Sequence, residues 1–243
     1  SLAKGKTILK NCAIEPEIED LINFLRKMGC NIKWTGKRTI TIVGVKLLKE
    51  TNYKVMFDRI EAGTYMIASV LMNGALKIKN INPKIIKNEI DILKKIGADI
   101  KTKESELRIV GKKSINNIKI TTAPYPGFPT DLQAQLMVLL CKGKGRSIIT
   151  EKIFENRFMH ASELNRMGAK INISGNKAII EGNINFNSAE LMATDLRASV
   201  SLILAALNAK GKSIINRIYH LDRGYENIEE KLKKVGAKIR RIS

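Results

Sequence analysis

The sequence has few aromatic residues, few cysteines and no long apolar run, and each shortage argues against a class of protein. Aromatic side chains make up 5% of the 243 residues, so no platform for stacking nucleic-acid bases stands out. The three cysteines, Cys12, Cys30 and Cys141, are scattered and lack the spacing of a metal site. Their odd number is typical of a reducing, cytoplasmic compartment. No apolar run approaches the roughly 20 residues of a membrane-spanning helix, so we predict no contact with a membrane.

Positive charge is what the sequence has in excess. Lysine and arginine number 43 against 23 acidic residues, which gives a formal net charge of +20. Such an excess can indicate nucleic-acid binding, because Lys and Arg neutralise phosphates. The lysines are spread over every expected element, however, and together with the many Ile and Asn residues they indicate a bias of the encoding genome. Nucleic-acid binding is therefore the less favoured interpretation, although the positive field would still concentrate small anionic ligands.

A pattern of about 70 residues recurs along the chain, as in repeat-built folds. Each copy has one glycine that begins a strand and, 23 to 25 residues later, a second glycine between a helix and the next strand. The strand-starting glycines are Gly5, Gly74, Gly145 and Gly211, and the helix-ending glycines are Gly29, Gly97, Gly168 and Gly236. A complete copy reads helix, strand, helix, strand, strand. The sequence therefore predicts an α/β (α+β) fold of similar units that pack their sheets against one another.

Hydrophobic periodicity and breaker residues predict the elements of each copy. We expect helices at residues 14–28, 58–74, 83–96, 136–140, 196–206 and 228–235, and one that ends at residue 167. We expect hairpins at residues 31–44, 99–111 and 170–182, and single strands at residues 76–78, 147–150, 213–215 and 238–242. Residues 45–56 are polar and are interpreted as a linker between two lobes.

The two ends of the repeat pattern are incomplete. The first copy starts at residues 1–5 without its opening helix, and the last copy stops after strand 238–242, which lacks the hairpin partner seen in the other copies. Native proteins normally pair or cover such an edge. We therefore expect this chain to be part of a longer protein whose amino-terminal portion pairs with that strand. A self-sufficient protein with degenerate end copies is the alternative.

Three aspartates, Asp58, Asp131 and Asp195, occupy equivalent places at the start of a helix. The simplest explanation is N-capping, in which the carboxylate accepts hydrogen bonds from the first backbone N–H groups. Asp131 differs, because Pro124, Pro126 and Pro129 stiffen the loop that delivers it to its helix. For Asp131 we favour a functional role, and for Asp58 we favour capping.

Arginines recur at the junctions between strands and helices. Arg157 and Arg223 fall at matching points of the third and fourth copies, while Arg59 and Arg197 follow a helix-opening aspartate. Guanidinium groups and helix N-termini cooperate in anion binding, so these four arginines predict an anion site. His160 and His220 lie in the same loops and are interpreted as structural rather than catalytic.

Five segments in order then carry a resemblance to a known family. They are DRIEAGT (58–64), TAPYPGFPTDLQAQ (122–135), ENRFMHASELNRMGA (155–169), ATDLRAS (193–199) and RIYHLDRGYE (217–226). Together they resemble the UDP-N-acetylglucosamine 1-carboxyvinyltransferases, enolpyruvyl transferases of the first committed step of peptidoglycan synthesis. The related 5-enolpyruvylshikimate-3-phosphate synthases share the fold but do not resemble these segments. The match covers essentially the whole chain.

This resemblance implies a fold and a place within it. It implies a two-lobed inside-out α/β barrel, in which each lobe contains three copies of a βαβαββ unit and substrates bind in the cleft. The chain would be the carboxyl-terminal portion, with the amino-terminal half missing. Residues 1–55 would end the first lobe, and residues 56–243 would form most of the second lobe without its amino-terminal strands.

The same resemblance implies site residues. Asp131 would contact the sugar nucleotide and act as the catalytic acid/base, Ile153 would contact UDP-N-acetylglucosamine, and Arg223 would hold phosphoenolpyruvate. The other residues that would line the same substrate-binding cleft are Arg157, Asp195 and Arg197. No metal or organic cofactor would be required. The implied setting is cytoplasmic, in cell wall biogenesis, cell shape and cell division.

Two parts of the family's site have no counterpart in this sequence. The reactive cysteine in a Gly-Gly-Cys loop and the Lys-Asn pair that grips phosphoenolpyruvate are both absent, and Cys12, Cys30 and Cys141 lie outside any such motif. We therefore expect little or no transferase activity from this chain alone. We expect it to need an amino-terminal half, which is either supplied by another chain or belongs to a longer protein of which this chain is a part. The alternative is a noncatalytic remnant or a basic module that binds anions or nucleic acid.

Overall fold

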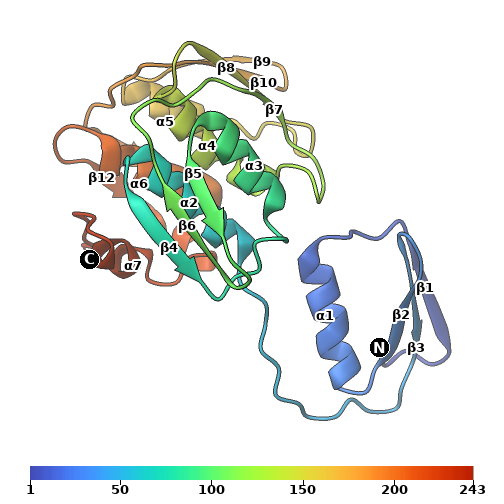
Figure 1. Ribbon diagram of the computed structural model, residues 1–243. Coiled ribbons are helices and arrows are strands. Elements are labelled where there is room, and N and C mark those ends of the chain that lie inside the picture. Colours follow the sequence, from blue (N-terminus) through green and yellow to red (C-terminus); the bar gives the residue numbers. More distant parts are fainter. Residues whose placement is uncertain (243) are drawn as a thin grey trace. The chain divides into compact units, whose positions relative to one another are not determined.

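The computed structural model describes residues 1–242 and divides into two compact units (Figure 1). The first unit contains Ser1–Asp58 and Pro124–Pro126, and the second contains Arg59–Ala123 and the chain from Gly127 onward. The assignment of residues 1–55 and 56–243 to two lobes of a longer fold stays a prediction.

The first unit is one helix on a three-stranded antiparallel sheet. Its elements are β1 (Lys6–Lys10), α1 (Pro16–Lys27), β2 (Asn31–Gly36) and β3 (Thr39–Val43), with strand order β1-β3-β2. Helix α1 begins at a proline, which needs no N–H partner at that position. Its buried Ile22 belongs to the same hydrophobic cluster as Ile32 and Ile40 of the sheet. The predicted helix and hairpin are confirmed, and residues 44–58 contain neither helix nor strand.

The second unit contains the remaining helices and strands. Its helices are α2 (Arg59–Leu71), α3 (Lys87–Ile96), α4 (Gln133–Cys141), α5 (His160–Arg166), α6 (Leu196–Asn208) and α7 (Ile228–Lys234), with short 3-10 helices η1 (Thr130–Leu132) and η2 (Ile218–Arg223). Its strands are β4 (Ala75–Lys79), β5 (Asp99–Thr102), β6 (Glu106–Val110), β7 (Lys119–Thr121), β8 (Arg146–Thr150), β9 (Lys170–Ser174), β10 (Lys177–Glu181), β11 (Glu190–Met192) and β12 (Ile214–Asn216). The sheet orders are β4-β6-β5, β7-β8-β10-β9 and β11-β12.

Helices α2, α4 and α6 form the centre of this unit and the sheets lie outside them (Figure 1). All nine residues of α4 are buried, and α2 and α6 are buried over most of their length. A helix that is apolar on every side requires neighbours on every side. The strands of the outer sheets instead alternate between buried and exposed residues, as in β6. Helices inside and sheets outside are the arrangement predicted by the resemblance.

The repeat predicted from the glycines is present in the backbone. In the first three copies the strand after the first glycine pairs antiparallel with the last strand, in the pairs β1–β3, β4–β6 and β8–β10. The helix-ending glycines Gly29, Gly97, Gly168 and Gly236 all have positive φ, between 92° and 118°. This left-handed conformation ends a helix at little cost only when the residue is glycine.

Two expectations about elements were wrong. Residues 237–242 form no strand, because no described segment offers the ladder of a hairpin partner. Arg241 instead pairs with Asp222 at 2.6 Å and with Glu229 at 3.1 Å. The helix expected from residue 83 begins only at Lys87, after a turn. The glycine and periodicity pattern did not locate the short strands β7 and β11. They precede α4 and α6, as the first strand of the βαβαββ unit does, and they pair parallel with β8 and β12.

Candidate active site

Asp131 lies between two arginines that come from distant parts of the sequence. Arg157 Nη2 donates to Asp131 Oδ1 at 2.8 Å, and Arg197 Nη2 lies 3.1 Å from Asp131 Oδ2. Asp131 belongs to η1, Arg157 to the loop between β8 and α5, and Arg197 to the first turn of α6. The three side chains are between 19% and 35% exposed. They therefore form one charged cluster that solvent or a ligand can reach.

The Asp131 carboxylate does not cap a helix, although its position in the sequence suggested this. It lies inside η1, and helix α4 begins two residues later with Leu132 as an N-cap residue without a side-chain cap. Gln135 Nε2 donates to the Asp131 backbone carbonyl at 3.1 Å and so helps to hold η1 on α4. Because it caps no helix, the Asp131 carboxylate is available to pair with the guanidinium groups of Arg157 and Arg197.

Charge decides the protonation of Asp131. Burial by itself would raise the pKa of its carboxyl group, but the guanidinium groups of Arg197 and Arg157 outweigh burial and hold this pKa below its ordinary value. The group is therefore ionised at neutral pH. In this arrangement Asp131 can accept a proton before it can donate one.

Asp195 caps helix α6 as the sequence suggested. Its Oδ1 accepts from the backbone N–H groups of Arg197 at 2.7 Å and Ala198 at 2.9 Å. Such a cap fixes the first turn of the helix and complements its dipole. Because Arg197 lies in that turn, Asp195 orients the backbone from which Arg197 reaches Asp131.

His160, the first residue of α5, is buried close to this cluster. Burial lowers the pKa of its imidazole to about 4, Asp195 opposes this shift and Arg157 adds to it. The imidazole is therefore neutral at pH 7 in the folded chain.

The buried neutral His160 predicts a loss of stability in acid. In the unfolded chain it takes up a proton near pH 6.5, whereas in the folded chain it does so only near pH 4. Unfolding therefore binds a proton between these values, and the free energy of unfolding falls as the pH drops through them. Urea unfolding at pH 7 and pH 4.5 is expected to show about 2 kcal/mol more loss for the wild type than for His160→Gln. Equal losses would contradict the neutral buried state.

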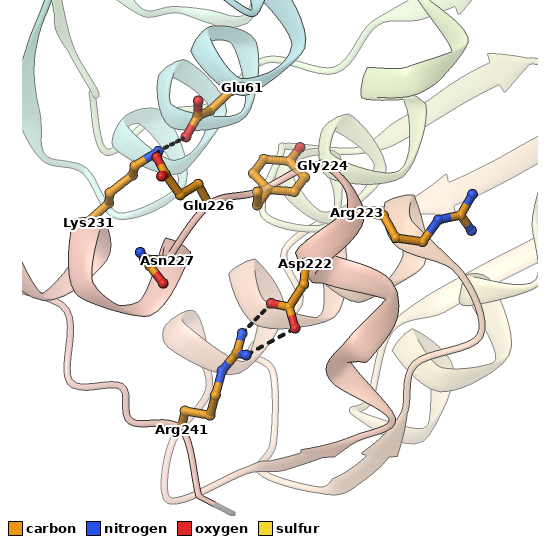
Figure 2. A pocket seen from close by; sticks show the side chains of 9 residues that line it. Glu61, Asp222, Arg223, Gly224, Glu226, Asn227, Lys231 and Arg241 are labelled. Atoms are coloured by element: carbon orange, nitrogen blue, oxygen red, sulfur yellow. Dashed lines mark hydrogen bonds and ion pairs between the residues drawn. The ribbon is translucent and has the colours of Figure 1, made fainter.

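In the part of the chain that the structure describes, neither Ile153 nor Arg223 forms a hydrogen bond or ion pair with the charged cluster. Ile153 is 38% exposed, and its backbone N–H donates to Glu151 at 2.7 Å. Arg223 is an exposed residue at the end of η2 and lines a cavity of about 520 Å³. Figure 2 shows its side chain directed away from the ion pairs of this cavity, which join Lys231 to Glu61 and Arg241 to Asp222. Within residues 1–242, no hydrogen bond or ion pair links Arg223 to Asp131.

Arg59 is unsuited to the anion site predicted for it. Its side chain is 9% exposed, and Nη1 lies 3.8 Å from Oε1 of the buried Glu89 on α3. A buried charge needs a partner, and here Glu89 supplies an opposite charge inside the fold. Sequence position alone placed Arg59 with the other three arginines, and burial separates it from them.

Glu151 is a residue of this region that the sequence interpretation missed. It directly follows β8, is 2% exposed, and its carboxylate accepts from Thr122, Thr130, Ile153 and Phe154. One signal could have identified it. The equivalent positions of the other copies hold Asn11, Asn80 and Arg217, so an acidic residue at this place is peculiar to the third copy.

Neither a metal-binding cluster nor a reactive Cys141 thiol is found among the described residues. Along residues 1–242 no group of three or more His, Cys, Asp or Glu side chains could hold a metal ion. Cys12, Cys30 and Cys141 are free, and burial raises the pKa of the Cys141 thiol to about 12. A thiol of this kind is a poor nucleophile at neutral pH.

Along residues 1–242 no helix is both long and apolar enough to cross a membrane.

The sequence model of one protein family, EPSP synthase (3-phosphoshikimate 1-carboxyvinyltransferase), matches residues 1–232. The chain belongs to this family. Two relatives in the family are named UDP-N-acetylglucosamine 1-carboxyvinyltransferase. The protein from Pelagibacter ubique is 73% identical over 242 residues, and that from Desulfosudis oleivorans is 50% identical over 243 residues. The resemblance carried by the five segments is thereby confirmed.

Solved structures of the family show the same fold. The enolpyruvyl transferase NikO from Streptomyces tendae superposes with a TM-score of 0.88 at 29% identity, over 98% of this chain and 57% of its own. EPSP synthase from Acinetobacter baumannii superposes with a TM-score of 0.73 at 21% identity, which supports the fold alone. The predicted enolpyruvyl transferase fold is confirmed. The chain spans 58% of the length of the two named relatives.

Proposed function

We propose that this chain forms part of an enzyme that transfers the enolpyruvyl group of phosphoenolpyruvate to the 3-hydroxyl group of UDP-N-acetylglucosamine. The observation that carries this proposal is the ionised Asp131 between Arg157 and Arg197, in a chain 73% identical to a UDP-N-acetylglucosamine 1-carboxyvinyltransferase. The reaction would serve peptidoglycan synthesis in the cytoplasm, and through it the cell wall, cell shape and cell division.

The chemistry explains why these residue types are needed. The sugar hydroxyl oxygen bonds to C2 of phosphoenolpyruvate while C3 gains a proton, and loss of phosphate and of a proton from C3 then restores the double bond. Asp131 accepts the hydroxyl proton as the new C–O bond forms, a contribution of about 10²- to 10⁴-fold. Its depressed pKa keeps this base ionised.

The arginines serve the anionic parts of both substrates. Arg157 and Arg197 hold Asp131 and line the sugar-nucleotide side of the cleft with Asp195, and Ile153 contacts UDP-N-acetylglucosamine. Arg223, exposed at the end of η2, holds phosphoenolpyruvate. Guanidinium groups suit phosphate and carboxylate because they donate two parallel hydrogen bonds and stabilise charge that develops on oxygen.

A complementation experiment tests the proposal. The chain is mixed with a polypeptide that corresponds to the part of the Pelagibacter ubique relative that it does not span. Phosphate release is then measured with phosphoenolpyruvate and UDP-N-acetylglucosamine. We expect turnover from the mixture and little or none from either polypeptide alone, because the Lys-Asn pair and the reactive cysteine lie outside this chain.

Size-exclusion chromatography of the mixture makes a negative result informative. If the two polypeptides associate and no phosphate is released, the transferase proposal is wrong for this chain. A noncatalytic anion-binding module would then be the better interpretation. Retention on duplex DNA with a steep salt dependence would favour nucleic-acid binding instead.

A further inference from the structure

We propose that Glu151 is a positioning residue whose buried carboxylate holds together the two loops that carry the charged cluster. One loop leads through Thr122 and Thr130 to Asp131, and the other runs from Glu151 to Arg157. The inference rests on the proposed function, because it assigns a role in the same site.

The carboxylate of Glu151 joins the two loops with both of its oxygens. Oε1 accepts from Thr122 Oγ1 at 2.7 Å, from Ile153 N at 2.7 Å and from Phe154 N at 3.2 Å. Oε2 accepts from Thr130 Oγ1 at 2.8 Å. Two donors therefore come from the loop before Asp131 and two from the loop that leads to Arg157. We call these five residues the Glu151 clamp.

Further backbone contacts close the clamp. Thr122 Oγ1 also accepts from Lys152 N at 2.9 Å, and Thr122 N donates to Thr150 O at 2.9 Å. The loop that starts at Thr122 returns on itself through the hydrogen bond from Ala123 N to Phe128 O at 3.0 Å. The loop before Asp131 is thus fixed at both ends by strand β8 and the residues that follow it.

Burial explains why the clamp is rigid. A carboxylate that is 2% exposed would be very costly without hydrogen bonds, and here four donors satisfy it. Bonds to an ionised acceptor are roughly twice as strong as neutral ones. Moving either loop would leave part of this buried charge unsatisfied, so the network resists such movement.

The other copies of the repeat show that this place in the fold does not require a carboxylate. Asn11, Asn80 and Arg217 occupy it in the first, second and fourth copies, and all three have positive φ, between 56° and 60°. Glu151 alone does not share that backbone conformation. The third copy also supplies both Asp131 and Arg157. The carboxylate at this position therefore occurs in the copy that contributes two of the three residues of the charged cluster.

The clamp reaches the reacting groups through their immediate neighbours. Thr130 directly precedes Asp131, and the Phe154 ring lies under the guanidinium of Arg157 at 4.5 Å. Asp131 therefore follows, and Arg157 contacts, a residue that is hydrogen-bonded to Glu151, and these two side chains form the 2.8 Å pair. A displacement of about 1 Å at such a pair can reduce a rate by 10²-fold.

The first test measures geometry in the full chain and does not depend on activity. Thr130→Val removes one hydroxyl of the clamp, Glu151→Ala removes the acceptor, and Thr150→Val removes a neighbouring hydroxyl outside the clamp. We expect NMR titration to show the pKa of Asp131 rising toward its ordinary value in the first two variants and unchanged in the third. Hydrogen exchange of the Ile153 and Phe154 amides is expected to accelerate at least tenfold in Glu151→Ala.

The second test measures kinetics in the complemented enzyme. We expect kcat/KM to fall by about 10-fold in Thr130→Val and about 10²-fold in Glu151→Ala. The KM for UDP-N-acetylglucosamine should rise, because Ile153 and Asp131 lose their support, while the KM for phosphoenolpyruvate stays within twofold, because Arg223 lies outside the clamp. Glu151→Gln keeps an acceptor of the same shape and should restore most of the loss.

The outcomes separate the clamp from the proposed function. If Thr130→Val and Glu151→Ala fold and both the pKa of Asp131 and the amide exchange match the wild type, the clamp is wrong whatever the kinetics show. If Glu151→Ala does not fold, Thr130→Val decides the question on the Asp131 titration. A wild-type mixture whose two polypeptides associate without turnover would refute the proposed function and leave the NMR result to judge the clamp.

Discussion

Asp131→Asn is expected to lower the turnover of the complemented enzyme by about 10²- to 10⁴-fold. The change keeps the shape of the side chain and removes the group that accepts the hydroxyl proton. Steady-state phosphate release measures turnover, and urea unfolding measures stability. The stability cost is expected to stay below about 1 kcal/mol, the range of partly exposed ion pairs. The lost interactions are the contacts to Arg157 and Arg197 rather than a helix cap.

Glu163→Gln is the matched control for this change. Glu163 also pairs with an arginine, since Arg166 Nη1 lies 2.9 Å from its Oε2, and it accepts from Met192 N at 2.9 Å. It lies on α5, outside the charged cluster, and we expect turnover within twofold of the wild type. Turnover of Asp131→Asn that matched this control would remove Asp131 from the mechanism.

The pH dependence of the free energy of unfolding, compared between the wild type and Asp131→Asn, gives a second check. Because the pKa of Asp131 is depressed in the folded chain, its charge stabilises the fold above the unfolded-state pKa of about 4. This contribution is lost as the pH falls through the lower folded-state value. Asp131→Asn lacks the group and should show a shallower loss of stability at acidic pH than the wild type.

The repeat and most helices could be predicted because they depend on local chemistry. The glycines that end helices, such as Gly97 with φ of 118°, reveal a left-handed backbone position from the residue type alone. Apolar periodicity located α1 and α6 within a few residues of their observed bounds. These signals need no knowledge of which segments meet in space.

What could not be predicted depends on contacts between distant segments. The family resemblance placed Asp131 and Arg197, 66 positions later, in one cleft, but it did not show that their side chains would form an ion pair. Nor did the sequence show that Arg59 would be buried beside Glu89. It placed Asp131 at a helix start but could not show that η1 would turn the carboxylate away from the cap position. The donors of Glu151 could not be predicted either, because only the folded loops bring all four of them together.

The repeat also explains where the fold tolerates no side chain. The residue after the last strand of each of the first three copies is a glycine, at Gly44, Gly111 and Gly182. Each donates its N–H to the strand-starting glycine of the same copy, at 2.8 to 2.9 Å. A Cβ atom at any of the three would lie within 2.8 Å of a backbone carbonyl oxygen. Close backbone approach, repeated in each copy, is the reason for glycine at these places.

Gly182→Ala is expected to destabilise the chain by about 3 kcal/mol or more, a large part of a typical folding free energy. Its Cβ would lie 1.9 Å from Gly143 O and 2.7 Å from Gly145 O. Relief of this overlap must separate the strands and break the bonds from Gly182 N to Gly145 O and from Asn183 N to Gly143 O, both 2.8 Å long. Urea unfolding followed by circular dichroism measures the change.

Gly74→Ala is the control, because Gly74 belongs to the equivalent pair of hydrogen-bonded glycines in the second copy. Gly74 accepts the hydrogen bond of Gly111 N at 2.8 Å, yet a Cβ on Gly74 would meet nothing closer than Ser69 O at 3.8 Å. Its backbone is also outside the left-handed region, so we expect a change within about 0.5 kcal/mol. Equal effects of the two substitutions would mean that glycine serves flexibility at these pairs. A large effect confined to Gly182 would show that backbone contact holds the strands of the third copy together, which fixes the sheet from which Glu151 and Arg157 emerge.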